Sequence, residues 1–286
     1  MYPKTRVRGF DYLAYLASFF NLIEVNSTFY RIPDRSMCQS WARRVDHLDG
    51  FQFSVKLFRE FTHGKRLAIS SDLSSFKRAI EPLAEANRLT AVLVQFPWSF
   101  RFTPETTRYI SQLASEIAPW PTTFEVRHGS WGHDEARWFL EENRIGMCGI
   151  DQPLIGDSVT PDRYVIDGAG AYFRLHGRNY GEWFKANTNR DRRYDYLYSP
   201  EELREWVGRV REAAQKTQRV HVVLNNHFEG QAVANALAID AMLKGKPVRA
   251  PGHIKNRYTS LASFLEKDAS PPPEADGQRS LFDNGN

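Results

Sequence analysis

The amino-acid sequence predicts an α/β fold: a TIM-type (β/α) barrel that lacks its first strand and carries a disordered C-terminal tail. Short apolar segments alternate with amphipathic helical patterns, as parallel strands joined by helical crossovers require. Residues 1–246 match the ~250 residues that such a barrel typically uses. An open doubly wound sheet is the alternative, but neither GxGxxG nor GxxxxGK(S/T) follows any predicted strand.

Seven segments have the apolar content and length of strands: Leu22–Ser27, Phe51–Lys56, Ala91–Phe96, Thr123–His128, Ile145–Asp151, Ala171–His176 and Val220–Asn225. A helical pattern at Asp11–Phe20 precedes them. Others lie between or after them, at Asp34–Val45, Asp72–Arg88, Pro104–Ile117, Asp134–Asn143, Pro200–Ala214 and Gly230–Leu243. Two of these helices have clear start signals, because Thr103 and Ser199 each place a capping hydroxyl before a first-turn proline.

The first strand of the expected barrel is missing, since only a helical pattern precedes Leu22. A barrel short of one strand leaves two strand edges unpaired, which is an aggregation hazard. We therefore expect a further strand to be encoded upstream of Met1. We predict the barrel domain over residues 1–258 and a Pro-rich, disordered tail over residues 259–286.

The composition predicts a globular protein of the cytoplasm. The 286 residues are 42% hydrophobic and 25% charged, which is too apolar for a disordered chain. The net charge of +4 permits a polyanionic partner without requiring one. The two cysteines, Cys38 and Cys148, are far apart and fit a reducing compartment. The longest early apolar stretch, Leu13–Ile23, is too short to span a membrane, so no membrane partner is expected.

The polar residues of the predicted strands gather on one face. Side chains two residues apart in a strand share a face. One face of each strand is apolar and is assigned to packing against the outer helices. The other face is assigned to the interior, with polar groups toward the C-terminal end where barrel enzymes keep their chemistry. This interior set is Glu24, Asn26, Thr28, Gln52, Ser54, Lys56, Gln95, Glu125, Arg127, Asp151, Tyr172, Arg174, His176, His221, Asn225 and His227.

These residues predict a ligand site at the C-terminal mouth of the barrel. The alternative is a structural role, in which these interior side chains only pair with one another. A purely structural interior would have to pair every buried ion, because each unpaired one costs several kcal/mol. The guanidinium groups of the arginines in this region suit phosphate or carboxylate. The predicted substrate-binding residues are Lys56, Arg127, Arg174, Arg178, Asn26, Gln95, Asn225, Asn226 and His227. The predicted acid–base groups or metal ligands are Glu125, Asp151, His176 and Glu24. A divalent metal is compatible with this set but is not required by it, because cations accompany the carboxylates.

The loops after the predicted strands combine aromatic and basic residues. The longest loop, Gly177–Tyr198, contains six aromatic residues and five cations. Such a loop can stack unpaired bases, close over a substrate, or simply pack its own rings together. His63, in another basic loop, is a further candidate for substrate contact. No GxSxG motif is present, and no histidine lies near either cysteine in sequence, which disfavours Ser or Cys nucleophiles.

An ordered series of motifs resembles the YecE-like family, domain of unknown function 72. The motifs span about Tyr2 to Leu243 and are Val25–Arg31, Phe53–Lys56, Val94–Pro97, Phe124–His128, Arg174–Arg178 and Asn225–Gly230. The resemblance implies a TIM-barrel fold and no established reaction. Family members normally open with a strand carrying a Gly-Ser-Gly-Trp-type motif before a Tyr-Pro, and only Tyr2-Pro3 is present here. Such barrels are similar in fold to endonuclease IV and xylose isomerase, whose metal clusters lack this balance of Arg and Lys.

The end of the tail predicts a docking peptide. Gln278, Leu281 and Phe282 match the pattern by which bacterial replication and repair proteins bind the sliding clamp. The Pro-rich segment before them would act as a tether for this short motif. Arg279 stands where the pattern favours Leu, and a polar terminus without function is the alternative.

Together these features predict an enzyme whose mouth binds a phosphorylated substrate, either a small molecule or a nucleic acid, with hydrolysis as the expected reaction. Two alternatives stay open: a non-catalytic module associated with nucleic acid, and a metal-dependent sugar isomerase or lyase.

Overall fold

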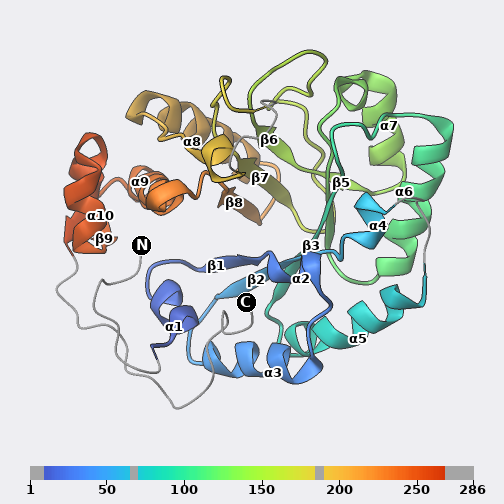
Figure 1. Cartoon of the computed structure of the whole chain (residues 1–286), viewed down its shortest axis with the longest axis horizontal. Helices are drawn as coiled ribbons and strands as arrows, with labels where there is room; N and C mark the ends of the chain where they lie inside the picture. The colour runs from blue at the N-terminus through green and yellow to red at the C-terminus, as the bar shows by residue number, and fades with distance from the viewer. Residues whose placement is uncertain (1–9, 65–69, 184–189, 268–286) are drawn as a thin grey trace.

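The computed structural model describes residues 10–64, 70–183 and 190–267, whose strands form two larger parallel sheets and one small one (Figure 1). The first sheet holds, in order, β1 (Leu22–Val25), β2 (Gln52–Lys56), β3 (Leu89–Gln95), β4 (Thr122–Glu125) and β5 (Gly146–Met147). The second holds β6 (Gly149–Asp151), β7 (Ala171–Leu175) and β8 (Val220–Leu224). In the third, β9 (Val248–Ala250) pairs with β10 (Leu265–Lys267). Parallel pairing sets the C-terminal ends of neighbouring strands at one edge of each sheet.

Helices connect the strands and lie along the outside of the sheets (Figure 1). The α-helices are α1 (Tyr12–Ala17), α2 (Ser27–Tyr30), α3 (Arg35–Arg44), α4 (Glu60–His63), α5 (Ser71–Glu85), α6 (Pro104–Ile117), α7 (Asp134–Glu142), α8 (Pro200–Ala214), α9 (Gln231–Lys244) and α10 (Gly252–Arg257). The 3-10 helices are η1 (Gly129–Gly132), η2 (Arg190–Tyr194), η3 (Phe228–Gly230) and η4 (Thr259–Phe264). The predicted caps are confirmed, because Thr103 and Ser199 each accept a hydrogen bond from the third backbone amide of their helix.

The seven predicted strands are all present, with one difference. The fifth is divided at Cys148, so that β5 pairs with β4 in the first sheet and β6 pairs with β7 in the second. Helices α2, α4 and α10 and strands β9 and β10 are not indicated by the sequence. Each has six residues or fewer, which is too short for a hydrophobic period to show.

The two larger sheets face a common interior. Arg174 on β7 hydrogen-bonds to Glu24 on β1 and to Glu125 on β4. At the opposite ends of the strands, the Thr90 hydroxyl of β3 lies 3.1 Å from His221 Nε2 of β8. Contacts between strands so far apart in the two sheets require both sheets to curve around the same side chains.

The register confirms the predicted interior face for six strands and corrects it for one. Glu24 pairs with Ser54, and Gln95 pairs with Glu125, so these side chains share the interior face. The prediction that Asp151 faces the interior is wrong. It pairs with Leu175, whereas the preceding residue Ile150 pairs with the inward-facing Arg174. Because side chains alternate along a strand, Ile150 is interior and Asp151 faces the outer helices.

The structured chain continues beyond residue 258, where the tail was expected to start. Helix η4 and strand β10 follow, and Leu261 and Leu265 are buried in the same apolar cluster as α9. Residues 259–267 therefore contain regular structure that packs on the preceding helices.

The outer edges of the larger sheets are β1 and β8. No ladder between the described residues joins these two strands, and every residue of both is half-buried. By contrast, every residue of β3 and β7 is buried. In the described part of the chain, no helix has the length and apolar character needed to cross a bilayer.

Candidate functional site

Arg174 lies at the centre of the polar interior and is paired on both sides. Its side chain is 1% exposed. The Nε atom donates to Glu24 Oε2 at 3.1 Å, Nη2 donates to Glu24 Oε1 at 2.5 Å, and Nη1 donates to Glu125 Oε2. The Tyr172 hydroxyl lies 3.0 Å from Glu24 Oε2 and 2.9 Å from Ser54 Oγ. Arg174 therefore joins β1 to β4 through two carboxylates, which leaves little capacity for a ligand.

Glu125 is the carboxylate on which several donors converge. Oε1 accepts from Gln95 Nε2 at 2.6 Å and from Arg127 Nε at 2.8 Å, and Oε2 accepts from Arg174. Burial alone would raise the pKa of Glu125, but the charges of Arg174 and Arg127 hold it well below its usual range. Glu125 is consequently ionised throughout the physiological range and anchors the surrounding donors.

His176 is fully buried beside this carboxylate. Asn225 Nδ2 lies 3.1 Å from His176 Nδ1, and His176 Nε2 lies 3.3 Å from Glu125 Oε1 and 3.4 Å from Arg127 Nη2. Burial lowers the pKa of His176 to about 4 despite the opposing charge of Glu125. The ring is therefore neutral near pH 7 and holds Asn225 and Glu125 together.

Lys56 is the cation of the cluster that has no carboxylate partner among the described residues. Its ammonium group donates to Gln95 Oε1 and lies 3.9 Å from the centre of the Phe29 ring. Burial, followed by the positive charge of Arg174, lowers the pKa of Lys56 to about 8. Its amine thus titrates near neutral pH, at the C-terminal end of β2.

Arg127 lies at the opening of the cluster, between Glu125 and an aromatic group. Its side chain is 16% exposed, and Nη2 lies 2.7 Å from Glu125 Oε1. The guanidinium carbon lies 6.0 Å from the centre of the Trp183 ring, which also lies 6.0 Å from the Tyr194 ring. Tyr194 is 5.0 Å from the ring of His227. The loop after β7 therefore places aromatic rings next to this half-buried cation.

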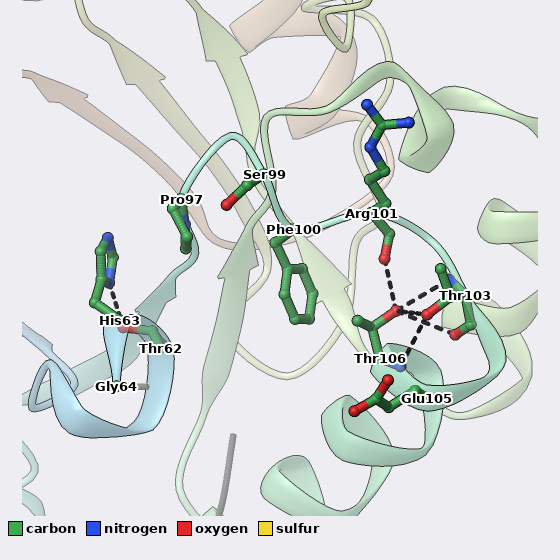
Figure 2. A pocket seen from close by; sticks show the side chains of 10 residues that line it. All are labelled: Thr62, His63, Gly64, Pro97, Ser99, Phe100, Arg101, Thr103, Glu105 and Thr106. Carbon is green, nitrogen blue, oxygen red and sulfur yellow. Dashed lines mark hydrogen bonds between the residues drawn. The ribbon is translucent and has the colours of Figure 1, made fainter. Parts of the chain in front are cut away.

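A pocket of about 610 Å³ adjoins this opening (Figure 2). Figure 2 shows that it lies between the segment at His63, the loop at Pro97 and the start of α6 at Thr103. The His63 ring packs edge-on against Phe29, over which Lys56 lies. Burial and the charges of Lys56 and Arg127 lower the pKa of His63 to about 4. The charges of Lys56 and Arg127 therefore act on a residue that lines this pocket.

Comparison with known proteins agrees with the motif series and the geometry. Residues 1–257 match the family described as "Protein of unknown function DUF72". The chain belongs to the DUF72 family. The curated UPF0759 protein YunF of Bacillus subtilis is 28% identical over 232 residues, which are 77% of this chain and 82% of that protein.

Solved structures of two DUF72 proteins resemble this one. The protein from Thermotoga maritima is 35% identical, with a TM-score of 0.68 over 79% of this chain and 85% of the other. The protein from Enterococcus faecalis is 26% identical, with a TM-score of 0.72 over 81% of this chain and 88% of the other. These names state a family and carry no activity or ligand.

The DUF72 interior brings together most of the predicted site residues. Those in mutual contact are Glu24, Lys56, Gln95, Glu125, Arg127, Arg174, His176 and Asn225. Asn26 and His227 are exposed at the ends of β1 and β8. Gln278, Leu281 and Phe282, predicted to bind a clamp, lie outside the described residues.

Three predicted site residues lie outside this cluster. Asp151 accepts hydrogen bonds at 3.0 Å from Arg178 Nε and from Trp206 Nε1 of α8. Arg178 also donates to Glu202 at 3.0 Å. Asn226 donates to the Tyr196 carbonyl at 2.7 Å. These contacts hold the loop after β7 against α8 and the segment after β8. The three residues therefore position this loop.

Sequence reasoning missed Gln152 as a part of the site. Gln152 is 2% exposed, and neither polar atom of its amide has a partner. It was missed because the interior position on that strand was assigned to Asp151. A strand periodicity that gave Ile150 the interior position would have found it.

The residues of the DUF72 cluster do not favour a metal ion. Within the described ranges, no three His, Cys, Asp or Glu side chains are placed to hold one. The oxygens of Glu24 and Glu125 that a cation would need already accept hydrogen bonds from guanidinium groups.

Proposed function

We propose that the two larger sheets form a TIM-like (β/α) barrel whose C-terminal mouth binds a phosphorylated substrate through Arg127 and Lys56. The strand order and the contacts of Arg174 across both sheets support a barrel. Strands β1 and β8, which no ladder between the described residues joins, lie where the expected first strand would pair. Enzymes with a TIM-barrel fold keep their chemistry at the C-terminal ends of the strands, and Lys56 and Arg127 lie at such ends.

The charge balance of the cluster carries this proposal. Glu24 and Glu125 are compensated by Arg174 and Arg127, whereas Lys56 adds a positive charge that only an amide oxygen and an aromatic face contact. A half-buried cation without a counter-ion has lost part of its hydration, and a bound anion would offset that loss. Phosphate suits the site because a guanidinium can give it two parallel hydrogen bonds.

The aromatic surface beside Arg127 favours a nucleotide or nucleic acid over a simple phosphate. Trp183 lies beside the cation and Tyr194 lies against Trp183, and flat rings of this kind stack on bases. A basic opening bordered by aromatic rings is the arrangement that holds single strands without strong sequence preference.

For the reaction we propose hydrolysis of a phosphate ester. Water adds to phosphorus, the ester P–O bond breaks, and protonated Lys56 gives its proton to the leaving oxygen. One proton of the attacking water then returns the amine to its ammonium form, and the other stays on the phosphate product. A pKa of about 8 suits this role, because the group is protonated at neutral pH yet releases its proton readily. Arg127 would stabilise the charge that develops on the phosphoryl oxygens. We do not extend the proposal to a metal-dependent isomerase, because Glu24 and Glu125 are already engaged.

Calorimetric titration tests the proposal with inorganic phosphate, AMP and an eight-residue oligothymidylate as probes. We expect binding that weakens between 50 and 200 mM salt, and Arg127→Met should weaken it by about tenfold or more, since hydrogen bonds to charged groups contribute ~1.5–3 kcal/mol. Lys216→Ala is the matched control. It removes an exposed cation at the C-terminal end of α8, far from the mouth. Hydrolysis of bis(4-nitrophenyl) phosphate is measured in parallel.

Two results would change this view. Binding that is equal in wild type and Arg127→Met would contradict the mouth as the site. Tight oligonucleotide binding with no hydrolysis would instead favour the non-catalytic module.

A further inference from the structure

Gln152 is the buried amide of the described chain that lacks a partner at both ends, whereas Asn226 lacks one only at Oδ1. The amide of Gln95 is satisfied at both ends, by Lys56 and by Glu125. That of Asn235 donates to the Tyr198 carbonyl and accepts from the Tyr198 backbone amide. In Gln152 both Nε2 and Oε1 are buried without a partner. Leaving such groups unsatisfied is destabilising, so native proteins retain few of them.

The register places this amide beside the mouth. Ile150 pairs with Arg174, and the ladder continues as the His176 amide donates to the Asp151 carbonyl at 2.8 Å. Continuing the register by one residue sets Gln152 beside His176, on the interior face. The face opposite belongs to Asp151, which contacts α8.

The loop that starts at Gln152 returns along the segment after β4. The Val159 amide donates to the Arg127 carbonyl at 3.0 Å, and the Gly129 amide donates to the Asp157 carbonyl at 2.8 Å. The segment that begins at Gln152 therefore lies next to two residues of the proposed phosphate site. These are Arg127, which follows β4, and His176, which follows β7.

We propose that the Gln152 carboxamide reads the edge of a nucleobase whose phosphate lies on Arg127 and Lys56; this inference rests on the proposed function. A carboxamide offers one acceptor and adjacent donors in a plane, which matches the N6 and N7 edge of adenine. The ligand would supply the two hydrogen bonds that the protein leaves unmade. The substrate class is then an adenine nucleotide or an adenine-containing single strand.

The test compares AMP with ribose 5-phosphate, which has the phosphate and the sugar but no base. Wild type should prefer AMP by about tenfold or more, as a bidentate amide contact supplies. Gln152→Met keeps the shape of the side chain and removes both polar atoms, so this preference should collapse while ribose 5-phosphate binds as before. Gln152→Glu keeps the acceptor and replaces the donor group by a second acceptor. The ratio of AMP affinity to ribose 5-phosphate affinity should fall in this variant as well. The added negative charge acts on the phosphate of both probes, so it does not by itself change that ratio.

Thermal unfolding without ligand supplies a second readout. Because Gln152→Met removes two unsatisfied buried polar atoms, its melting temperature should rise above that of wild type. Gln215→Met, at the exposed end of α8, is the matched control and should change neither readout.

The outcomes separate the two proposals. An unchanged AMP preference in Gln152→Met, or a lowered melting temperature in that variant, overturns the inference and leaves phosphate binding standing. If wild type binds neither AMP nor ribose 5-phosphate, the proposed function fails and this inference fails with it.

Discussion

Replacing Arg174 should unfold the interior rather than merely weaken a ligand. Arg174→Met keeps most of the side-chain length but removes a guanidinium that is 1% exposed and that contacts Glu24 and Glu125. Both carboxylates would stay buried with less compensation. Breaking a buried ion pair by removing one partner costs ~3–5 kcal/mol. For a chain of this size that corresponds to a fall of about 6–20 °C in melting temperature.

The loss should depend on pH in a defined direction. Arg174 and Arg127 hold the pKa of Glu125 below its usual range, so this carboxylate contributes stability above its unfolded pKa of about 4.3. That contribution is lost as pH falls through the lowered pKa. The difference between wild type and Arg174→Met should therefore be largest near pH 7 and should shrink below about pH 4.

Calorimetry of four proteins decides the matter. Arg174→Met combined with Glu24→Gln and Glu125→Gln removes the orphaned charges and should recover much of the lost melting temperature. Arg204→Met breaks an exposed pair with Glu201 and should change stability by less than about 1 kcal/mol. A fall of under 2 °C for Arg174→Met, or no recovery in the triple variant, would refute Arg174 as the link between the sheets.

Three further predictions follow from the structure and the sequence. Phosphate binding should weaken as pH rises through about 8, because Lys56 loses its proton there, and calorimetric titration from pH 6.5 to 9.5 should show no such step in Lys56→Met. Backbone amides of β1 and β8 should exchange hydrogen faster than those of β3 and β7, because β1 and β8 are half-buried whereas β3 and β7 are buried. Equal protection of the four strands would mean that the edges of β1 and β8 are covered. A labelled peptide of residues 274–286 should bind the sliding clamp of the same organism and lose binding with Leu281→Ala and Phe282→Ala; no anisotropy change at ~100 μM clamp would contradict this.

The alternation of strands and helices could be predicted because each element obeys a local rule. The cap residues Thr103 and Ser199 begin the helices where expected, and the strands that carry Glu24 and Glu125 show clear alternation. The polar interior was also predictable from that alternation, because each such strand separates polar from apolar residues cleanly.

What failed was the assumption that a polar residue on a barrel strand points inward. In β6 the interior position belongs to Ile150, and Asp151 is instead stabilised by Arg178 and Trp206 from elements distant in sequence. Similarly, no local pattern shows that Arg174 pairs with two carboxylates, or that Lys56 has no carboxylate partner among the described residues. Those facts depend on which strands meet across the interior.

The most direct measurement is a crystal structure of the protein with AMP. The account predicts the phosphate within hydrogen-bond distance of Arg127 and Lys56, with the Lys56 ammonium redirected from Gln95 toward the phosphate oxygens. A phosphate bound elsewhere, or a mouth in which Lys56 still donates only to Gln95 at saturating AMP, would contradict it.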